Sequence, residues 1–288
     1  SSSVDQMTGF PGDALEDLVV RALAEDIGDG DRTTEAVVAP DVRLKGLVVA
    51  REPLVVAGVS VFHSVYRCLG DSEAIQDATE DGMVLEAGQV IASIQTDARR
   101  LLTGERVALN IAQRLSGIAT LTRAFVDEVR GTGARILDTR KTTPTLRDLE
   151  KYAVKAGGGF NHRFGLFDAM LLKDNHIAAA GGLSRAFRRA REVCSDGMRL
   201  QVEVDTIEQL REALDVGADM ILLDNMTVKD VGFAVQLVEG RARLEATGGV
   251  TLANVRGFAQ TGVDDISVGA LTHSARAVDI GLDVPSWK

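Results

Sequence analysis

Short apolar runs alternate with amphipathic stretches through the second half of the chain. The runs are rich in β-branched and aliphatic residues, which predicts strands. They are Ala134–Asp138, Ala169–Leu172, Leu200–Val204, Met220–Leu223, Ala242–Ala246 and Asp265–Val268. The intervening stretches have helical periodicity, at Ser184–Val193, Thr206–Val216, Val228–Val238 and Leu252–Gln260. Strands that alternate with helices of this length indicate βαβ units and a parallel sheet, and this spacing favours an α/β barrel. A seventh strand near Gly159–Arg163 leaves the count short of eight.

The first 115 residues have a different pattern. A helix is predicted over Ala14–Glu25 with Asp13 as its N-cap, and a long helix over Ala98–Val129. Short strand-like runs lie between them, at Leu44–Ala50, Val55–Ala57, Gly82–Leu85 and Val90–Ile94. We therefore expect an N-terminal α/β domain over 1–115, a barrel over 116–274, and a tail, 275–288, that packs back on the N-terminal domain. Asp31–Thr34 either caps a helix or supports a partner's site.

Each predicted strand of the second half ends in a polar group or a glycine. These ends are Asp138-Thr139-Arg140-Lys141, Lys173, Glu203, Asp224, Thr247-Gly248-Gly249 and Gly269. In α/β barrels the active site collects at the carboxyl ends of the strands. The positions therefore predict one site at a common mouth.

The charge distribution narrows the kind of ligand. The chain carries a net charge of −10, which argues against binding to a nucleic-acid backbone. Residues 138–176 nevertheless hold seven Lys or Arg against five acids. No apolar run is long enough to span a bilayer, no secretion signal is expected at the N-terminus, and the two cysteines suit a reducing cytoplasm. We expect a local pocket for a small, highly charged anion.

Four bases near these strand ends, with a histidine beside them, form a predicted cationic wall: Arg140, Lys141, His162, Arg163 and Lys173. The Arg fork matches a carboxylate or phosphate, and Lys supplies a point charge. The alternative is that individual bases pair with Asp138, Asp168 or Asp174.

Glu203 and Asp224 close consecutive strands, so their carboxylates are expected side by side. They suit Mg²⁺, which takes one or two carboxylates together with substrate phosphates. The alternatives are a general acid–base pair or an ion pair with Lys173. Gly248-Gly249 and Gly269-Ala270 match the phosphate site of late barrel loops, although a glycine pair also makes a simple turn. His273 is a candidate phosphate contact, and no His or Cys spacing indicates zinc.

Long motifs across most of the chain resemble quinolinate phosphoribosyltransferase. They are Thr103–Asn110, Leu115–Thr120, Asp138–Pro144, Gly157–Arg163, Leu171–His176, Glu203–Asp205, Leu223–Asn225, Thr247–Gly249 and Val268–His273. The resemblance implies an N-terminal α/β sandwich, an open seven-stranded α/β barrel and a homodimer with shared active sites. It also implies an Mg²⁺-dependent enzyme of NAD biosynthesis that makes nicotinate mononucleotide, CO₂ and pyrophosphate from quinolinate and phosphoribosyl pyrophosphate.

The resemblance also implies residue roles. Arg140, His162, Arg163 and Lys173 are expected to bind the quinolinate carboxylates, joined by Arg106 of the neighbouring subunit. Thr139 lies beside them in the same motif, and Lys141, Glu203 and Asp224 are expected to engage the ribose, the pyrophosphate and Mg²⁺. The 5′-phosphate loops are Thr247, Gly248 and Gly249, and Val268, Gly269 and Ala270, with His273 nearby. The family usually has Ser where this chain has Thr247, which keeps the hydroxyl. Lys141, Lys173, Glu203 and Asp224 are the expected catalytic residues.

Three other functions fit part of the pattern. A paralogous phosphoribosyltransferase of the molybdenum-transport-associated type would keep the fold and change the substrate. A barrel lyase would use Lys173 as a Schiff-base nucleophile, which requires an apolar surround. A non-catalytic anion sensor would leave the paired carboxylates unexplained.

Overall fold

The computed structural model describes residues 11–285, which form two compact units. Among the described residues, the first comprises 11–123, 143–158 and 274–285, and the second comprises 124–142 and 159–273. Each unit has its own sheet. The N-terminal stretch in which no secretion signal is expected, residues 1–10, lies outside the described residues.

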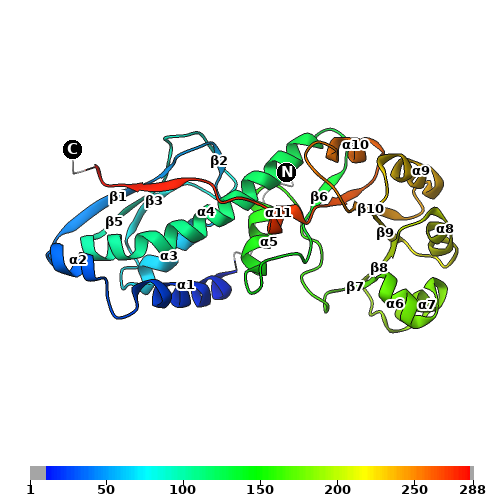
Figure 1. The fold of residues 1–288 in the computed structure, drawn as a ribbon, viewed down its shortest axis with the longest axis horizontal. Helices are drawn as coiled ribbons and strands as arrows, with labels where there is room; N and C mark the ends of the chain where they lie inside the picture. The colour runs from blue at the N-terminus through cyan, green and yellow to red at the C-terminus, as the bar shows by residue number, and fades with distance from the viewer. Residues whose placement is uncertain (1–10, 286–288) are drawn as a thin grey trace. The chain divides into compact units, whose positions relative to one another are not determined.

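The first unit combines an antiparallel sheet with helices (Figure 1). The sheet has the order β12-β1-β5-β3, and β2 pairs with β4 in a separate ribbon. The strands are β1 (Arg43–Ala50), β2 (Leu54–Val55), β3 (Ile75–Ala78), β4 (Val84–Leu85), β5 (Val90–Asp97) and β12 (Ile280–Asp283). The helices are α1 (Gly12–Ile27), α2 (Arg32–Val37), α3 (Val59–Cys68), α4 (Ala98–Glu128, whose residues from 124 onward are counted with the second unit) and α5 (Arg147–Ala156).

The start of α1 differs from the prediction, and the start of α2 shows what Asp31 does. The predicted N-cap Asp13 is wrong, because α1 begins at Gly12 after Pro11 and Asp13 lies in its first turn. Proline is favoured at a helix start because its fixed φ suits the first turn. Asp31 caps α2, since its carboxylate accepts a hydrogen bond of 3.0 Å from the Thr34 main-chain N–H.

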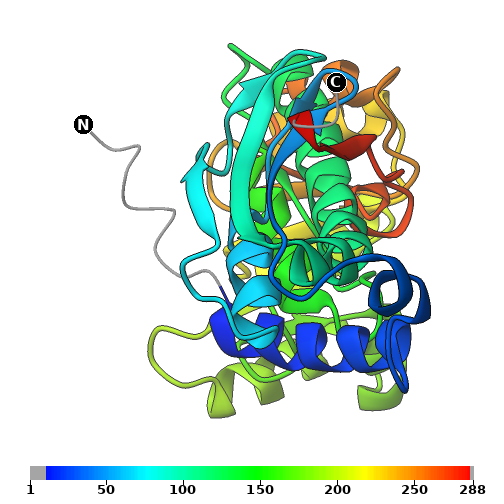
Figure 2. The ribbon, with the colours of Figure 1, turned by 90° about the vertical axis from the view of Figure 1, so that its left-hand side faces the viewer.

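The C-terminal segment returns to the N-terminal sheet. Strand β12 pairs antiparallel with β1, from Leu47 opposite Asp283 to Ala50 opposite Ile280. In the two ribbon views the red β12 lies beside the blue β1 (Figure 1, Figure 2). Ion pairs between Arg51 and Asp283 and between Arg276 and Glu52 hold the same segment. This strand covers an edge of the sheet that would otherwise be open.

The second unit is built on a parallel six-stranded sheet of order β6-β11-β10-β9-β8-β7. The strands are β6 (Arg135–Leu137), β7 (Ala169–Leu172), β8 (Arg199–Val204), β9 (Met220–Asp224), β10 (Arg243–Thr247) and β11 (Asp265–Ser267). The helices are α6 (Asp174–Ala180), α7 (Leu183–Val193), α8 (Ile207–Asp215), α9 (Val228–Val238), α10 (Val255–Gln260) and α11 (Ala270–His273). Figure 1 shows α7, α8 and α9 on the convex side of the curved sheet. The predicted α/β fold with a parallel sheet is confirmed.

The predicted seventh strand near Gly159–Arg163 is not a regular strand. Phe160 makes one isolated parallel bridge to Leu137, next to β6. Beyond it the His162 main-chain N–H donates to the Asp138 carboxylate at 2.8 Å, where a strand would use a main-chain carbonyl. A side chain that competes for main-chain donors ends the ladder. Over the described residues the sheet is therefore not closed into a barrel.

Alternation along the strands separates the core from the concave face. On β10, Leu244 and Ala246 are buried on one side, and Glu245 and Thr247 point to the other. On β8, Gln201 and Glu203 alternate in the same way with Val202. The polar side chains of the sheet thus share one face. Over residues 11–285, no helix is long and apolar enough to cross a membrane.

Candidate active site

A cavity of about 140 Å³ lies at the carboxyl ends of the parallel strands of the second unit. Most predicted site residues line it together. The lining residues are Thr139, Arg140, Lys141, His162, Arg163, Leu171, Lys173, Glu203, Leu222, Asp224, Glu245, Thr247 and Ser267. The expectation of one mouth at the strand ends therefore holds for the strands β6 to β10 and for the loop at 162–163.

Hydrogen bonds to the main-chain N–H and carbonyl of Lys141 hold the loop after β6. The Lys141 main-chain N–H donates to the Thr139 hydroxyl at 3.0 Å, and its carbonyl accepts from the Thr272 hydroxyl at 2.7 Å. A Cβ on Gly269 would lie 3.0 Å from Cδ of Lys141 and 3.2 Å from Nε2 of His273. Glycine at 269 therefore lets the Lys141 stem and the His273 ring approach the loop after β11.

Arg163 is the buried base of the cationic wall, with only 5% of its surface exposed. One guanidinium nitrogen donates to the Ala169 carbonyl at 3.0 Å, which fixes the direction of the fork. Burial lowers the pKa of Arg163, the neighbouring positive charge of Arg140 lowers it further, and Asp168 opposes both. An anion in the cavity would relieve this electrostatic cost.

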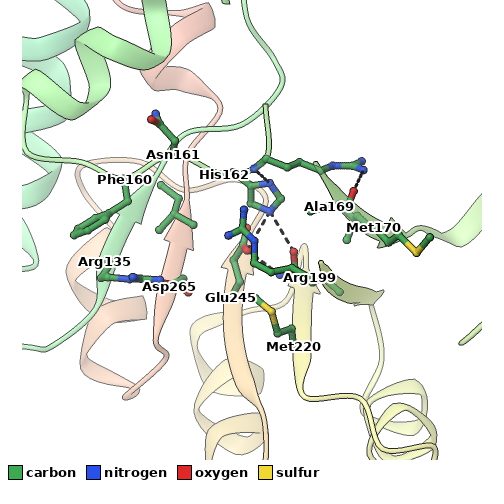
Figure 3. A pocket seen from close by; sticks show the side chains of 14 residues that line it. Arg135, Phe160, Asn161, His162, Ala169, Met170, Arg199, Met220, Glu245 and Asp265 are labelled. Carbon is green, nitrogen blue, oxygen red and sulfur yellow. Dashed lines mark hydrogen bonds and ion pairs between the residues drawn. The ribbon is translucent and has the colours of Figure 1, made fainter. Parts of the chain in front are cut away.

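His162, the histidine of the cationic wall, has partners on both ring nitrogens. Nδ1 accepts from the Arg163 main-chain N–H at 2.8 Å. Nε2 lies 3.3 Å from a Glu245 carboxylate oxygen and 3.2 Å from the Gln201 amide oxygen. Figure 3 shows the ring directed at Glu245. The ring is therefore held by the protein as well as lining the cavity.

The opposite side of the cavity carries Glu203 and Asp224. Lys173 Nζ lies 3.9 Å from Glu203, a long ion pair, and the Lys173 side chain remains 48% exposed. Burial raises the pKa of Glu203, the negative charges of Asp224, Asp174 and Asp205 raise it further, and Lys173 opposes the rise. An excess of negative charge thus faces the wall of bases.

A tight turn joins this acidic side to the loop after β10. Asn225 has a positive φ of 54°, and its main-chain N–H donates to the Thr247 carbonyl at 2.9 Å. Gly248 has φ of 92°, and a Cβ there would lie 2.2 Å from the Asn225 amide oxygen. The Asn225 side chain also donates to Asp224 at 2.8 Å. Glycine at 248 is therefore required for the Asp224 and Thr247 ends to meet.

Several predicted residues do not line this cavity. Gly248 and Gly249 follow directly after Thr247, and Val268, Gly269, Ala270 and His273 follow after Ser267. Arg106 belongs to the first unit, on α4, where it is exposed and lies 4.0 Å from Glu105.

Sequence reasoning missed four lining residues: Leu171, Leu222, Glu245 and Ser267. Glu245 had a detectable signal, because it is a charged residue inside the apolar run Ala242–Ala246. Buried charges require partners, so an acid within a buried strand marks a polar contact on the inner face.

The donor set fits a divalent cation bound with substrate. The described residues contain no cluster of three or more His, Cys, Asp or Glu side chains that could hold a metal alone. Glu203 and Asp224 lie close enough for the charge of one to raise the pKa of the other. Mg²⁺ suits two carboxylates completed by water and phosphate oxygens.

Family models match both parts of the chain. The description "Quinolinate phosphoribosyl transferase, N-terminal domain" matches residues 31–116, and "Quinolinate phosphoribosyl transferase, C-terminal domain" matches residues 118–283. Together these models cover most of the sequence.

Relatives and a solved structure agree with the family match. A nicotinate-nucleotide pyrophosphorylase (carboxylating) of Mycobacterium leprae is 48% identical over 278 residues, covering 94% of this chain and 98% of the relative. A probable nicotinate-nucleotide pyrophosphorylase (carboxylating) of Bacillus subtilis is 43% identical, covering 94% of this chain and 93% of the relative. The structure of the nicotinate-nucleotide pyrophosphorylase from Francisella tularensis matches with a TM-score of 0.92 and 38% identity, over 98% of this chain and 99% of that chain.

Proposed function

This chain belongs to the quinolinate phosphoribosyl transferase family, and from that premise we propose its reaction. It transfers the phosphoribosyl group of phosphoribosyl pyrophosphate to the nitrogen of quinolinate. The products are nicotinate mononucleotide, pyrophosphate and CO₂, and the reaction serves NAD biosynthesis. The observation that carries the proposal is that buried Arg163 lines the same cavity as Glu203 and Asp224.

Quinolinate occupies the side of the cavity formed by the cationic wall. Arg140, Arg163 and Lys173 neutralise its two carboxylates, and the buried Arg163 fork supplies paired donors. His162 contributes a ring edge beside them. Bound in this way, the dianion has a fixed orientation for attack by its ring nitrogen.

Phosphoribosyl pyrophosphate occupies the opposite side. Glu203 and Asp224 face the ribose and the metal site, and Lys141 faces the pyrophosphate. The loops at Thr247–Gly249 and Val268–Ala270 hold the 5′-phosphate, with His273 nearby, because main-chain N–H groups at glycines can approach an anion closely. Glu203 and Asp224 would hold Mg²⁺ together with substrate oxygens, and the metal would supply positive charge to the leaving pyrophosphate.

The chemistry follows from the two charged sides. Pyrophosphate departs with its electron pair and leaves a cationic ribose carbon, which the carboxylates of Glu203 and Asp224 stabilise. The quinolinate nitrogen forms the new bond to this carbon and becomes a pyridinium. That cation accepts the electron pair of the adjacent carbon–carboxylate bond as CO₂ is lost, and a proton from solvent replaces it.

The assembly around this site has three further proposed features. The curved six-stranded sheet, with the isolated bridge at Phe160 beside β6, forms an open α/β barrel. A homodimer supplies Arg106 of the partner subunit to the quinolinate side. The setting is the cytoplasm, which suits the two cysteines that lie unpaired, Cys68 and Cys194.

Pyrophosphate release tests the function. Mixing the protein with quinolinate, phosphoribosyl pyrophosphate and Mg²⁺ should release pyrophosphate and CO₂ in equal amounts. Nicotinate in place of quinolinate should give at most a small fraction of that rate, because it lacks the second carboxylate. Equal turnover of nicotinate, or pyrophosphate without CO₂, would support a paralogous transferase. A Schiff-base role for Lys173 is disfavoured by its exposure and by Glu203 nearby.

A further inference from the structure

The hydrogen bonds around His162 determine where its proton lies. A main-chain N–H can only donate, so Nδ1 of His162 must carry a lone pair toward the Arg163 N–H at 2.8 Å. The proton of the neutral ring is then on Nε2, facing Glu245 and Gln201. The Gln201 amide group completes the set by donating to the same Glu245 oxygen at 2.8 Å.

Glu245 is an unusual residue for its position. It lies in the middle of β10, between Leu244 and Ala246, with 4% of its surface exposed. One carboxylate oxygen of Glu245 accepts a hydrogen bond of 2.8 Å from the Gln201 amide and lies 3.3 Å from Nε2 of His162. One oxygen of this buried carboxylate therefore has dedicated donors in the His162 and Gln201 side chains, while the other oxygen has no hydrogen-bond partner within residues 11–285.

Glu245 and His162 also separate two cavities. The substrate cavity lies on one side, and a second cavity of about 130 Å³ lies on the other. Four residues line both: His162, Arg163, Leu171 and Glu245. Figure 3 shows the second cavity with the His162 ring between its walls. His162 and Glu245 thus border the substrate cavity next to the proposed quinolinate site. If they were not held in place, the Arg163 main chain, which is hydrogen-bonded to His162, could shift.

We propose that Glu245 is a positioning residue, which with Gln201 fixes His162 as the Nε2–H tautomer and thereby fixes the Arg163 end of the cationic wall. The proposal rests on the proposed function, since it concerns how quinolinate is held. It makes His162 a neutral link between a buried anion and the wall. The charges that neutralise the dianion then come from the arginines and lysines.

The first test reads the tautomer in the wild-type enzyme. The chain has four histidines, so a long-range ¹H–¹⁵N spectrum of ¹⁵N-histidine-labelled protein can be assigned with a His162→Gln variant. We expect His162 to be neutral with its proton on Nε2. A doubly protonated ring, or a proton on Nδ1, overturns the proposal whether or not any Glu245 variant folds.

The second test separates positioning from general stability. Glu245→Met keeps the approximate shape and removes the acceptor, so the quinolinate KM should rise about tenfold or more, with the phosphoribosyl pyrophosphate KM within about twofold. Glu245→Gln keeps an acceptor oxygen and should restore most of the loss. Equal changes in both KM values, or no change in either, contradict the proposal.

A matched control is available on the neighbouring strand. Asp265 is also a buried carboxylate, pairs in register with Glu245, and binds Arg135 and Arg243 away from the substrate cavity. Asp265→Asn should lower stability without a selective rise in the quinolinate KM. In a His162→Ala background, Glu245→Met should add less than about twofold, because the positioned ring is gone. Additive effects overturn the proposal.

Failure of this proposal differs from failure of the proposed function. A wild-type enzyme without quinolinate turnover contradicts the function. Normal turnover with a differently protonated His162, or with a Glu245→Met enzyme of unchanged KM, contradicts only the positioning role.

Discussion

A few side chains determine the chemistry of the cavity, and their burial matters as much as their charge. Arg163 is almost completely covered, whereas Lys173 on the same wall is half exposed. A charge held away from water interacts more strongly with a ligand of opposite sign. The buried fork should therefore contribute more to quinolinate binding than the exposed amine.

The contribution of the Arg163 guanidinium can be compared with that of a simple ammonium charge. Arg163→Lys keeps the charge and removes the paired donors, one of which also binds the Ala169 carbonyl. Loss of a charge-assisted hydrogen bond of about 1.5–3 kcal/mol should raise the quinolinate KM by roughly 10- to 100-fold. Steady-state kinetics with each substrate varied in turn provides the measurement.

Arg199→Lys is the control for this experiment. Arg199 is the first residue of β8 and lines the second cavity. Its replacement should leave both KM values within about twofold. A similar loss in both variants would show that arginine geometry at Arg163 is not specific to quinolinate.

The raised pKa of Glu203 predicts a pH dependence of metal use. Above this pKa the carboxylate is charged and, in the proposed function, would share Mg²⁺ with Asp224, and as the pH falls through it the charge is lost. The Mg²⁺ concentration for half-maximal activity should therefore increase as the pH falls. Titrations of Mg²⁺ between about pH 8 and pH 5 measure it.

Two variants frame the pH experiment. Glu203→Gln should need high Mg²⁺ at every pH and lose most of the dependence. Glu208→Gln, on the exposed start of α8, should behave as the wild type. A requirement for Mg²⁺ that stays constant in the wild type would contradict a direct role for the Glu203 charge.

At the scale of elements, parallel pairing brings the strand ends together and the following turns shape them. Thr247 pairs in register with Asp224, so the phosphate loop and the acidic side share one edge. Asn225 and Gly248 make the contact between the two turns. The substrate side of the sheet depends on these two backbone conformations.

Gly248→Ala should disrupt that junction. A Cβ at position 248 would collide with the Asn225 side chain and would force a positive φ on alanine. We expect a loss of about 2–4 kcal/mol of unfolding free energy and a higher KM for phosphoribosyl pyrophosphate. Urea unfolding and steady-state kinetics measure the two effects.

Gly249→Ala offers a comparison for stability alone. Its φ is 63°, but a Cβ there meets no atom within 4 Å, so only the backbone strain of about 1 kcal/mol remains. Equal destabilisation by the two substitutions would contradict the steric argument at Gly248.

For the whole molecule, the proposed function includes a second copy of the chain at each active site. Arg106 lies on α4 in the first unit and is exposed, while the cavity is built entirely from the second unit. A base supplied from a partner subunit would complete the wall. Assembly then becomes a condition for activity.

Subunit mixing tests this arrangement. Arg106→Ala and Lys173→Ala enzymes should each be nearly inactive, since each lacks one base at every site. A mixed dimer has one site that carries both changes and one that carries neither, so random reassociation should recover about a quarter of the wild-type activity. No recovery, with exchange of subunits verified by differently tagged chains, would place Arg106 outside a shared site.

The order of strands and helices in the second unit, and most residues that line the cavity, could be predicted from the sequence. Parallel strands place their carboxyl ends at one edge, so residues at the ends of the apolar runs, such as Lys173, Glu203 and Asp224, could be grouped without coordinates. The family motifs then suggested a role for each. Strand periodicity and strand-end chemistry are local properties, which a sequence expresses directly.

The partners and the burial of those residues became known only from the tertiary structure. Asp138 accepts the hydrogen bond from the His162 N–H that would extend a seventh strand. Glu245 and Gln201 hold the His162 ring. Both arrangements depend on side chains from distant segments. The exposure of Arg163 and Lys173 is likewise a property of packing. Sequence patterns report which face a residue points to, whereas partners and burial arise only when the strands are brought together.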